Sequence, residues 1–164
     1  MRGLFLSALF LAALCVLPGA GDLRAEDGEI FLRVRDWKTG EILAECPASV
    51  GGKLFFGWIH SLEHIPWNEY YHIDENLGIV LDSITFPAFG AGIPENKGKV
   101  CYVKDGLIHM EEIGQKFGYL DWLNSATATG DIMLDGVLVT RGEMLPHHAR
   151  VCLTIERGEK NERR

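Results

Sequence analysis

Short runs of alternating apolar and polar residues fill most of the chain, and tight-turn signals separate them. Residues 30–35, Ile-Phe-Leu-Arg-Val-Arg, alternate in part, as do residues 109–111. A period of two places one face of a strand in a core and the other in water, which is typical of antiparallel sheets. Helical periodicity is weak. Only residues 119–126 offer a turn or two of helix, with Leu120 and Leu123 on one side.

Three turn motifs predict three β-hairpins, because Asp-Gly tolerates the positive φ angles of a tight two-residue turn. The motifs are Lys38-Thr39-Gly40, Lys104-Asp105-Gly106 and Leu134-Asp135-Gly136. The expected strand pairs are 29–37 with 41–46, 99–104 with 107–113, and 131–134 with 137–140, and further strands are expected at 53–60, 67–74, 77–86 and 149–156. About nine or ten short strands predict an all-β fold, either an antiparallel sandwich or a small partly closed barrel built from consecutive hairpins, with at most one short helix.

Length and composition place one domain behind an N-terminal signal. The chain has 164 residues, of which 47% are apolar, enough for one buried core over residues 26–157 before a solvated charged tail at 158–164. Residues 1–25 combine a positive start, an apolar run over residues 4–17 and small residues at candidate cleavage sites. A membrane span needs about 20 apolar residues. We therefore expect a cleaved secretory signal and a location in the periplasm or cell envelope. The alternative is an uncleaved anchor, which would be the chain's membrane contact.

The net charge and the cysteines limit which partners, disulfides and metal sites the sequence predicts. The net charge of −7 and the absence of a basic patch argue against binding to nucleic acid or to anionic lipid surfaces. After cleavage three cysteines remain, Cys46, Cys101 and Cys152, so a monomer forms at most one disulfide. Cys101 and Cys152 lie in apolar strand-like runs, which favours buried thiols. Without a C-x-x-C pair, a structural zinc site is not predicted, and no cofactor is expected.

The densest group of unusual residues runs from His60 to Glu69. Its first part, His60-Ser61-Leu62-Glu63-His64, matches the H-x-x-E-H pattern of zinc proteases, in which a helix brings two imidazoles onto one face. Aromatic and β-branched residues precede this motif, and Pro66 follows two residues after it. A helix has about two turns in which to form, so we do not predict a metal centre here.

A β-hairpin with residues 61–66 as its connection fits this segment better. If His60 pairs with Trp67, then His60 and Glu69 become diagonal neighbours on one face of the sheet. A carboxylate beside an imidazole under aromatic cover is either a structural pair or an acid–base or ligand site. Both interpretations stay open. The candidate functional cluster is His60, Ser61, Glu63, Trp67 and Glu69.

A second distinctive stretch follows at residues 86–94, Phe-Pro-Ala-Phe-Gly-Ala-Gly-Ile-Pro. Its glycines permit close backbone approach. A phosphate cradle would need a following helix, which the sequence does not offer. The stretch is therefore either a tight crossing between sheets or a nest of backbone N–H groups that holds a carboxylate. The candidate loop residues are Phe89, Gly90, Ala91, Gly92 and Pro94.

Together, the two motifs resemble an uncharacterised bacterial family, domain of unknown function 1850 (DUF1850). The matching residues are His60, Ser61, Glu63, Pro66, Trp67 and Glu69, then Phe89, Gly90, Ala91, Gly92 and Pro94. The resemblance extends to residues 37–41 and to the final strand, and so to nearly the whole chain after the signal. Members are small exported or membrane-anchored proteins, often encoded beside TRAP transporters of the type that uses TAXI solute-binding proteins. The resemblance implies an accessory role in such uptake and supplies no catalytic residues.

Our functional hypothesis is a non-enzymatic binding or interaction module of the cell envelope, whose partners are TRAP transporter subunits or their solute-binding protein. The first alternative is a small hydrolase or ligand pocket that uses His60 as base, with Glu69 or Glu63 orienting it. The sequence offers this alternative no convincing nucleophile, because Ser61 lacks the context of a nucleophile elbow. The second alternative is a metal-binding domain that uses Glu63, Glu69, His72 and Asp74, although calcium loops usually carry more acidic residues.

Overall fold

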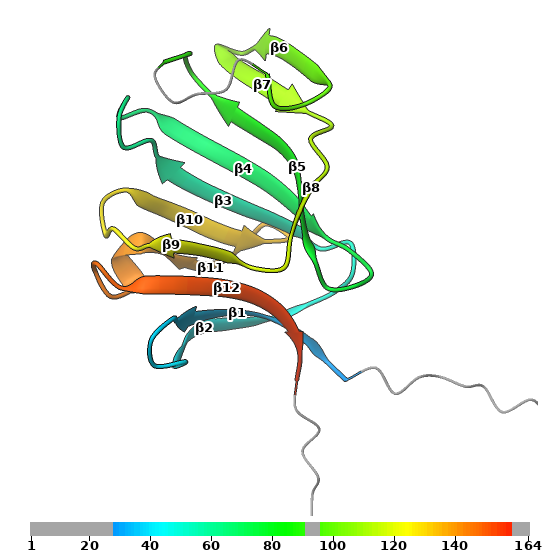
Figure 1. Cartoon of the computed structure of the whole chain (residues 1–164), viewed down its shortest axis with the longest axis vertical. Helices are drawn as coiled ribbons and strands as arrows, with labels where there is room; N and C mark the ends of the chain where they lie inside the picture. Colours follow the sequence, from blue (N-terminus) through cyan, green and yellow to red (C-terminus); the bar gives the residue numbers. More distant parts are fainter. Residues whose placement is uncertain (1–27, 91–95, 159–164) are drawn as a thin grey trace, which may run out of the picture.

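The structure, a computed structural model, describes residues 28–90 and 96–158 and consists of two antiparallel β-sheets that pack face to face (Figure 1). The expected all-β fold is confirmed. Of the two architectures left open, the sheets form a sandwich and are not closed into a barrel. The expected signal at 1–25 and residues 159–164 of the expected tail lie outside the described residues.

The smaller sheet has four strands in the order β2-β1-β12-β9. These strands are β1 (Ile30–Asp36), β2 (Ile42–Ala48), β9 (Leu120–Leu123) and β12 (Arg150–Arg157). The first strand, β1, pairs with β2 on one side and with β12, the last strand, on the other. The two ends of the described chain therefore meet in one sheet.

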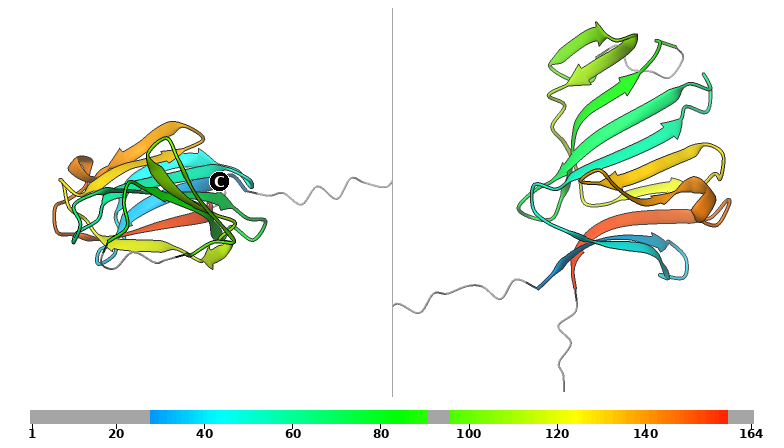
Figure 2. Two further views of the ribbon diagram at one scale, coloured as in Figure 1. Left: turned by 90° about the horizontal axis from the view of Figure 1, so that it is seen from above. Right: turned by 180° about the vertical axis from the view of Figure 1, so that it is seen from behind.

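The larger sheet has eight strands in the order β11-β10-β3-β4-β5-β7-β6, with β8 paired to β5 outside this order. Its strands are β3 (Lys53–Ile59), β4 (Pro66–Ile73), β5 (Ile79–Phe86), β6 (Val100–Lys104), β7 (Leu107–Glu111), β8 (Gln115–Phe117), β10 (Thr129–Leu134) and β11 (Val137–Arg141), and a single 3-10 turn, η1 (Gly142–Met144), follows β11. The β6–β7 hairpin lies at the end of the molecule farthest from the smaller sheet (Figures 1 and 2). The two sheets therefore overlap only in part.

One hydrophobic core fills the space between the sheets. The smaller sheet contributes alternate residues of β1 and β12, such as Leu32, Val34, Val151 and Leu153, all fully buried. The larger sheet contributes the inward positions of β3, β4, β5, β7 and β10, which include Leu54, Trp67, Tyr71, Ile84, Phe86, Met110 and Ile132. The predicted alternation is therefore confirmed, because each of these strands has one apolar face toward the core and one face toward solvent.

The predicted hairpin turns are confirmed. In the β6–β7 turn, Asp105 and Gly106 have φ angles of 52° and 77°. In the β10–β11 turn, Asp135 and Gly136 have φ angles of 50° and 80°. Positive φ at both central residues defines the two-residue turn whose twist matches that of the flanking strands. The Asp135 carboxylate also accepts a hydrogen bond from the Lys53 N–H at 2.8 Å, which ties this turn to the start of β3.

Residues 119–126, where the sequence allowed a turn or two of helix, form no helix and contain a strand that was not among the expected ones. Leu120–Leu123 is strand β9, which pairs with β12 so that Leu120 lies opposite Leu153. Leu120 is buried and Leu123 is exposed, so this segment presents strand alternation and not a helical face. No helix within 28–90 and 96–158 has the length and apolar character needed to span a membrane.

The three cysteines of the described chain are free thiols in different environments. Cys152 is buried, as the apolar run around it predicted, whereas Cys101 is exposed. The expectation of a buried Cys101 fails because β6 is an edge strand, all of whose residues are exposed. Cys46 is half-buried, and burial raises the pKa of its thiol.

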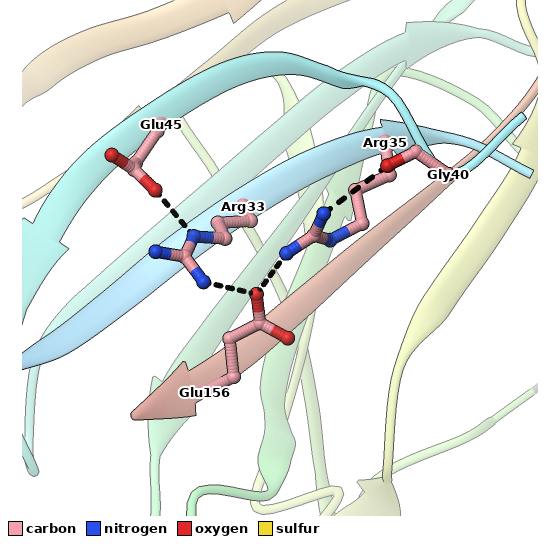
Figure 3. A network of polar contacts seen from close by, with 5 residues as sticks. All are labelled: Arg33, Arg35, Gly40, Glu45 and Glu156. Carbon is pink, nitrogen blue, oxygen red and sulfur yellow. Dashed lines mark hydrogen bonds and ion pairs between the residues drawn. The ribbon is translucent and has the colours of Figure 1, made fainter. Parts of the chain in front are cut away.

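The outer face of the smaller sheet carries a network of ion pairs across three strands (Figure 3). Arg33 on β1 contacts Glu45 on β2 and, at 2.7 Å, Glu156 on β12, and Arg35 contacts the same Glu156 oxygen. Burial opposes ionisation of Glu156, but its hydrogen bonds to Arg35 and Arg33 outweigh burial and lower its pKa. The network joins neighbouring strands, although solvent screening limits the stability that such surface pairs add.

The positive φ at Gly136 provides a test of the turn geometry. We expect Gly136→Ala to lower the free energy of unfolding by about 1 kcal/mol, because a Cβ disfavours the left-handed conformation. Gly118→Ala is the matched control. At both glycines an added Cβ has no neighbour within 4 Å, but only Gly136 has a positive φ. Urea denaturation measures both variants, and equal losses would contradict the turn argument.

Candidate functional site

The segment from His60 to Glu69 forms the β3–β4 hairpin, as expected, with a compact turn over residues 60–65. The His60 N–H donates to the Ile65 carbonyl, and the His64 N–H donates to the His60 carbonyl, both at 2.8 Å. His64 has a φ of 55° and is exposed, whereas His60 is half-buried. The two histidines therefore do not share a helical face, so the structure gives no support to a zinc-protease site.

The register of this hairpin differs from the expected one by two residues. Trp58 pairs with Trp67, and Phe56 pairs with Glu69. The predicted pairing of His60 with Trp67 is wrong because the connecting turn is shorter than expected. The hydrogen bond that closes it joins His60 to Ile65. A shift of two residues keeps every side chain on its expected face. It nevertheless separates His60 from Glu69 by about 13 Å along the strands, so they are not diagonal neighbours.

Glu69 lies on the inward face of β4 between two buried aromatic residues of the same strand. Its carboxylate accepts hydrogen bonds from the Trp67 indole N–H at 3.0 Å and from the Tyr71 hydroxyl at 2.6 Å. Burial and the Glu69 charge together raise the pKa of Tyr71 far above its ordinary value. Each carboxylate oxygen thus has a donor, which offsets the cost of holding a charge in a largely apolar interior.

His60 belongs to a row of rings that leads from the core to one end of the larger sheet. Its imidazole stacks on Trp58 with ring centroids 5.7 Å apart, and Trp67 lies 5.9 Å away. Trp67 in turn stacks on Phe86 at 4.8 Å with nearly parallel planes, and Phe86 meets Phe89 edge-on at 5.7 Å. We call these five residues, Trp58, His60, Trp67, Phe86 and Phe89, the aromatic row. They connect both sequence motifs through direct ring contacts.

The two motifs meet a second time where their loops approach each other. An ideal Cβ on Gly90 would lie 2.4 Å from the Glu63 carboxyl carbon, so the Glu63 side chain lies directly against the Gly90 backbone. The close approach that the glycine predicted is therefore confirmed at Gly90. Ala91, Gly92 and Pro94 lie outside the described residues. The Glu63 N–H approaches His60 Nδ1 at 3.4 Å, and Ser61 is exposed at the turn.

The residues of the metal-binding alternative do not converge. Glu69 and His72 lie on opposite faces of β4, and Asp74 accepts hydrogen bonds from the N–H groups of Asn76 and Gly78 in the turn after β4. Within the part of the chain that the structure describes, no three His, Cys, Asp or Glu residues are arranged to hold a metal ion.

Sequence reasoning did not find a groove of about 530 Å³ on the outer side of β5. His72 Nδ1 lies 2.7 Å from Asp82 Oδ1 there, and Lys99 and Glu112 also line the groove. Asp82 is the extra residue of a β-bulge, since Tyr70 pairs with Ser83 and Tyr71 with Leu81. The sequence carries no signal for this bulge, so the meeting of His72 with Asp82 was not predictable from alternation alone.

Fold and site together define a small all-β domain whose distinctive residues converge on one end of a sheet. The model of the family described as "Domain of unknown function (DUF1850)" matches residues 55–139, just over half of the chain, and the chain belongs to this family. The match covers both motifs, but it does not reach residues 37–41 or the final strand, so it is narrower than the resemblance implied. Neither a curated protein nor a solved structure matches the chain.

The hydrogen bonds to Glu69 lead to a stability test. We expect Glu69→Gln to lower the free energy of unfolding by about 2 kcal/mol, because a neutral amide weakens two charge-assisted hydrogen bonds. Glu75→Gln, in the exposed turn after β4, is the control and should change stability little. Urea denaturation at neutral pH measures both, and an unchanged Glu69→Gln variant would show that the carboxylate charge is not needed for folding.

Tyr71 leads to a test of pH dependence. In the folded chain the phenol stays protonated above its ordinary pKa of 10, whereas the unfolded chain releases the proton there. The unfolded state then binds fewer protons, so this contribution to stability is complete below pH 10 and is lost above it, by up to about 1.4 kcal/mol per pH unit. We expect Tyr71→Phe to lose less stability than the wild type between neutral pH and pH 11, measured by denaturation at each pH. Parallel losses would refute this assignment.

Proposed function

We propose that this protein is a non-enzymatic interaction module of the cell envelope, exported by its N-terminal segment and accessory to solute uptake of the TRAP type. One observation carries the proposal. Both family motifs converge where Glu63 lies against Gly90, and their neighbours Leu62 and Phe89 are 61% and 55% exposed. Exposed apolar side chains on loops held by a rigid scaffold are typical of recognition surfaces.

The aromatic row supplies the rigidity that such a surface needs. Phe89 packs on Phe86, which stacks on the buried Trp67. A side chain that is already ordered loses little conformational entropy when a partner binds. The loop over residues 60–65 is held in the same way, since His60 stacks on Trp58 and its backbone closes the turn. The proposed contact surface consists of Leu62, Glu63, Phe89 and Gly90.

The link to a transporter rests on association. It comes from the gene neighbourhood of the family and not from any contact in the chain. The hydrolase alternative used Glu69 or Glu63 to orient His60. The observed register separates Glu69 from His60, and the hydrogen bond from Glu63 to the imidazole comes from its backbone N–H. Glu69 is engaged by Trp67 and Tyr71, and His60 Nδ1 faces the Glu63 N–H. No further observation favours a reaction at this site, so we propose binding.

Co-purification from the native membrane tests the proposal. We expect the full chain, solubilised in mild detergent from the organism that encodes it, to bring along TRAP transporter subunits or their solute-binding protein, identified by mass spectrometry. The double variant Leu62→Ser/Phe89→Ser should recover about tenfold less of these subunits, because truncated apolar anchors each weaken an interface substantially.

The control is the double variant Leu123→Ser/Val137→Ser, which removes two side chains of similar exposure, 67% and 68%, from edge strands outside the two motifs. Circular dichroism confirms that both double variants are folded. The proposal fails if the wild type brings no transporter component, or if the control loses as much as the loop variant.

A further inference from the structure

The free edge of β6 differs from the other sheet edges of the described chain. On β2, Pro47 lacks an N–H, and a β-bulge interrupts the pairing with β1. Strands β8 and β9 have only three and four residues, and a bulge interrupts the pairing of β11 with β10. These features discourage pairing with another strand. The five residues of β6 pair regularly with β7 and contain no proline, and their one charged residue, Lys104, is the last of the strand.

The side chains of β6 are also open to solvent on both faces. Val100 and Tyr102 are each 37% exposed, and Val103 is 71% exposed. Cys101 is exposed as well. Within residues 28–90 and 96–158, no strand pairs with the outer edge of β6. A regular, apolar, unpaired edge is a template for the addition of another strand.

The turn after β6 determines which backbone groups face outward. Lys104 and Leu107 flank the two-residue turn, so they form a hydrogen-bonded pair. Because the pattern alternates, Tyr102 also directs its N–H and C=O toward β7, whereas Cys101 and Val103 direct theirs toward the free edge. A strand that pairs with β6 must therefore bond to Cys101 and Val103.

We propose that β6 pairs with β6 of a second copy of this chain, antiparallel and with Tyr102 on the two-fold axis. This register overlaps the whole of Val100–Lys104 with its copy and sets Cys101 opposite Val103 of the second copy, so that their outward backbone groups bond to each other. Registers centred on Cys101 or on Val103 also have the correct backbone phase, but they overlap only the first or only the last residues of the strand.

Charge complementarity supports the same register. Lys99 precedes β6 and Asp105 follows it, at equal distances from Tyr102. With Tyr102 on the axis, Lys99 of each copy lies beside the turn that carries Asp105 of the other copy, at both ends of the paired strands. A register displaced by one residue would set Lys99 against Lys104 of the other copy and would also put the backbone groups out of phase. Such charges select the register more than they add affinity.

Disulfide trapping tests the register directly. Residues on the axis of a non-hydrogen-bonded pair have Cα atoms about 4.5 Å apart, within the range that a disulfide spans. We expect the full chain with Cys101→Ser/Tyr102→Cys to form a covalent dimer when oxidised with diamide. Trapping suits this contact because one strand edge buries less area than a stable interface needs, so the dimer is transient.

The matched control is Cys101→Ser/Val100→Cys, on the same strand, on the same face and with the same exposure. Its new thiols would lie about 13 Å or more apart in the proposed register, and we expect at least tenfold less covalent dimer. Equal trapping of both variants, or none in either, would overturn the proposal. Circular dichroism before oxidation confirms that both variants are folded.

A third variant separates this inference from the proposed function. Adding Val103→Lys to the Cys101→Ser/Tyr102→Cys variant should reduce trapping at least tenfold, because it places a charge at the paired edge. Leu62→Ser/Phe89→Ser, added to the same background, should leave trapping unchanged. Unchanged trapping with Val103→Lys would refute pairing through β6. Loss of trapping with the loop variant would refute an interface confined to this edge.

Discussion

A four-stranded sheet is too narrow to cover the inner face of an eight-stranded one, and much of the structure follows from this mismatch. Apolar surface left in water costs about 25 cal/mol per Å². Phe86 and Met110 lie on β5 and β7, yet both are fully buried. Phe89 packs on Phe86, and the Lys97 N–H points at the Met110 sulfur. The described parts of the connection between β5 and β6 thus cover surface that the smaller sheet leaves open.

The aromatic row continues the core toward the motif loops, because its rings pack on one another from Trp58 to Phe89. Trp67 bridges two environments, because its ring stacks on Phe86 while its indole N–H bonds to Glu69. Glu69 is thereby held at the point where the interior meets the motif loops. A carboxylate at such a boundary fixes the orientation of its aromatic neighbours through directional hydrogen bonds.

Local signals in the sequence predicted the strands well. Asp105-Gly106 and Asp135-Gly136 marked two turns correctly because their conformations depend on nearest neighbours. The sequence placed His60, Trp67 and Glu69 on one face, since sidedness depends only on alternation. It missed their register, which depends on how the turn over residues 60–65 closes. It also missed the exposure of Cys101 and the pair of His72 with Asp82, because both depend on strand order and a bulge. The pairing of strands that are far apart in the sequence cannot be predicted from the pattern of a few neighbouring residues.

The placement of the tryptophans gives the molecule its own optical probes. Trp67 is buried, stacked on Phe86 and bonded to a fixed carboxylate, whereas Trp37, at the end of β1, is 44% exposed beneath the Arg150 guanidinium. Indole fluorescence follows the polarity and mobility of the surroundings. A soluble quencher therefore reaches Trp37 on the smaller sheet first and Trp67 on the larger sheet last. Trp58 and Trp122 are half-buried and lie between these extremes, so the readily quenched part of the emission reports on the surface near Trp37 and the protected part on the core around Trp67.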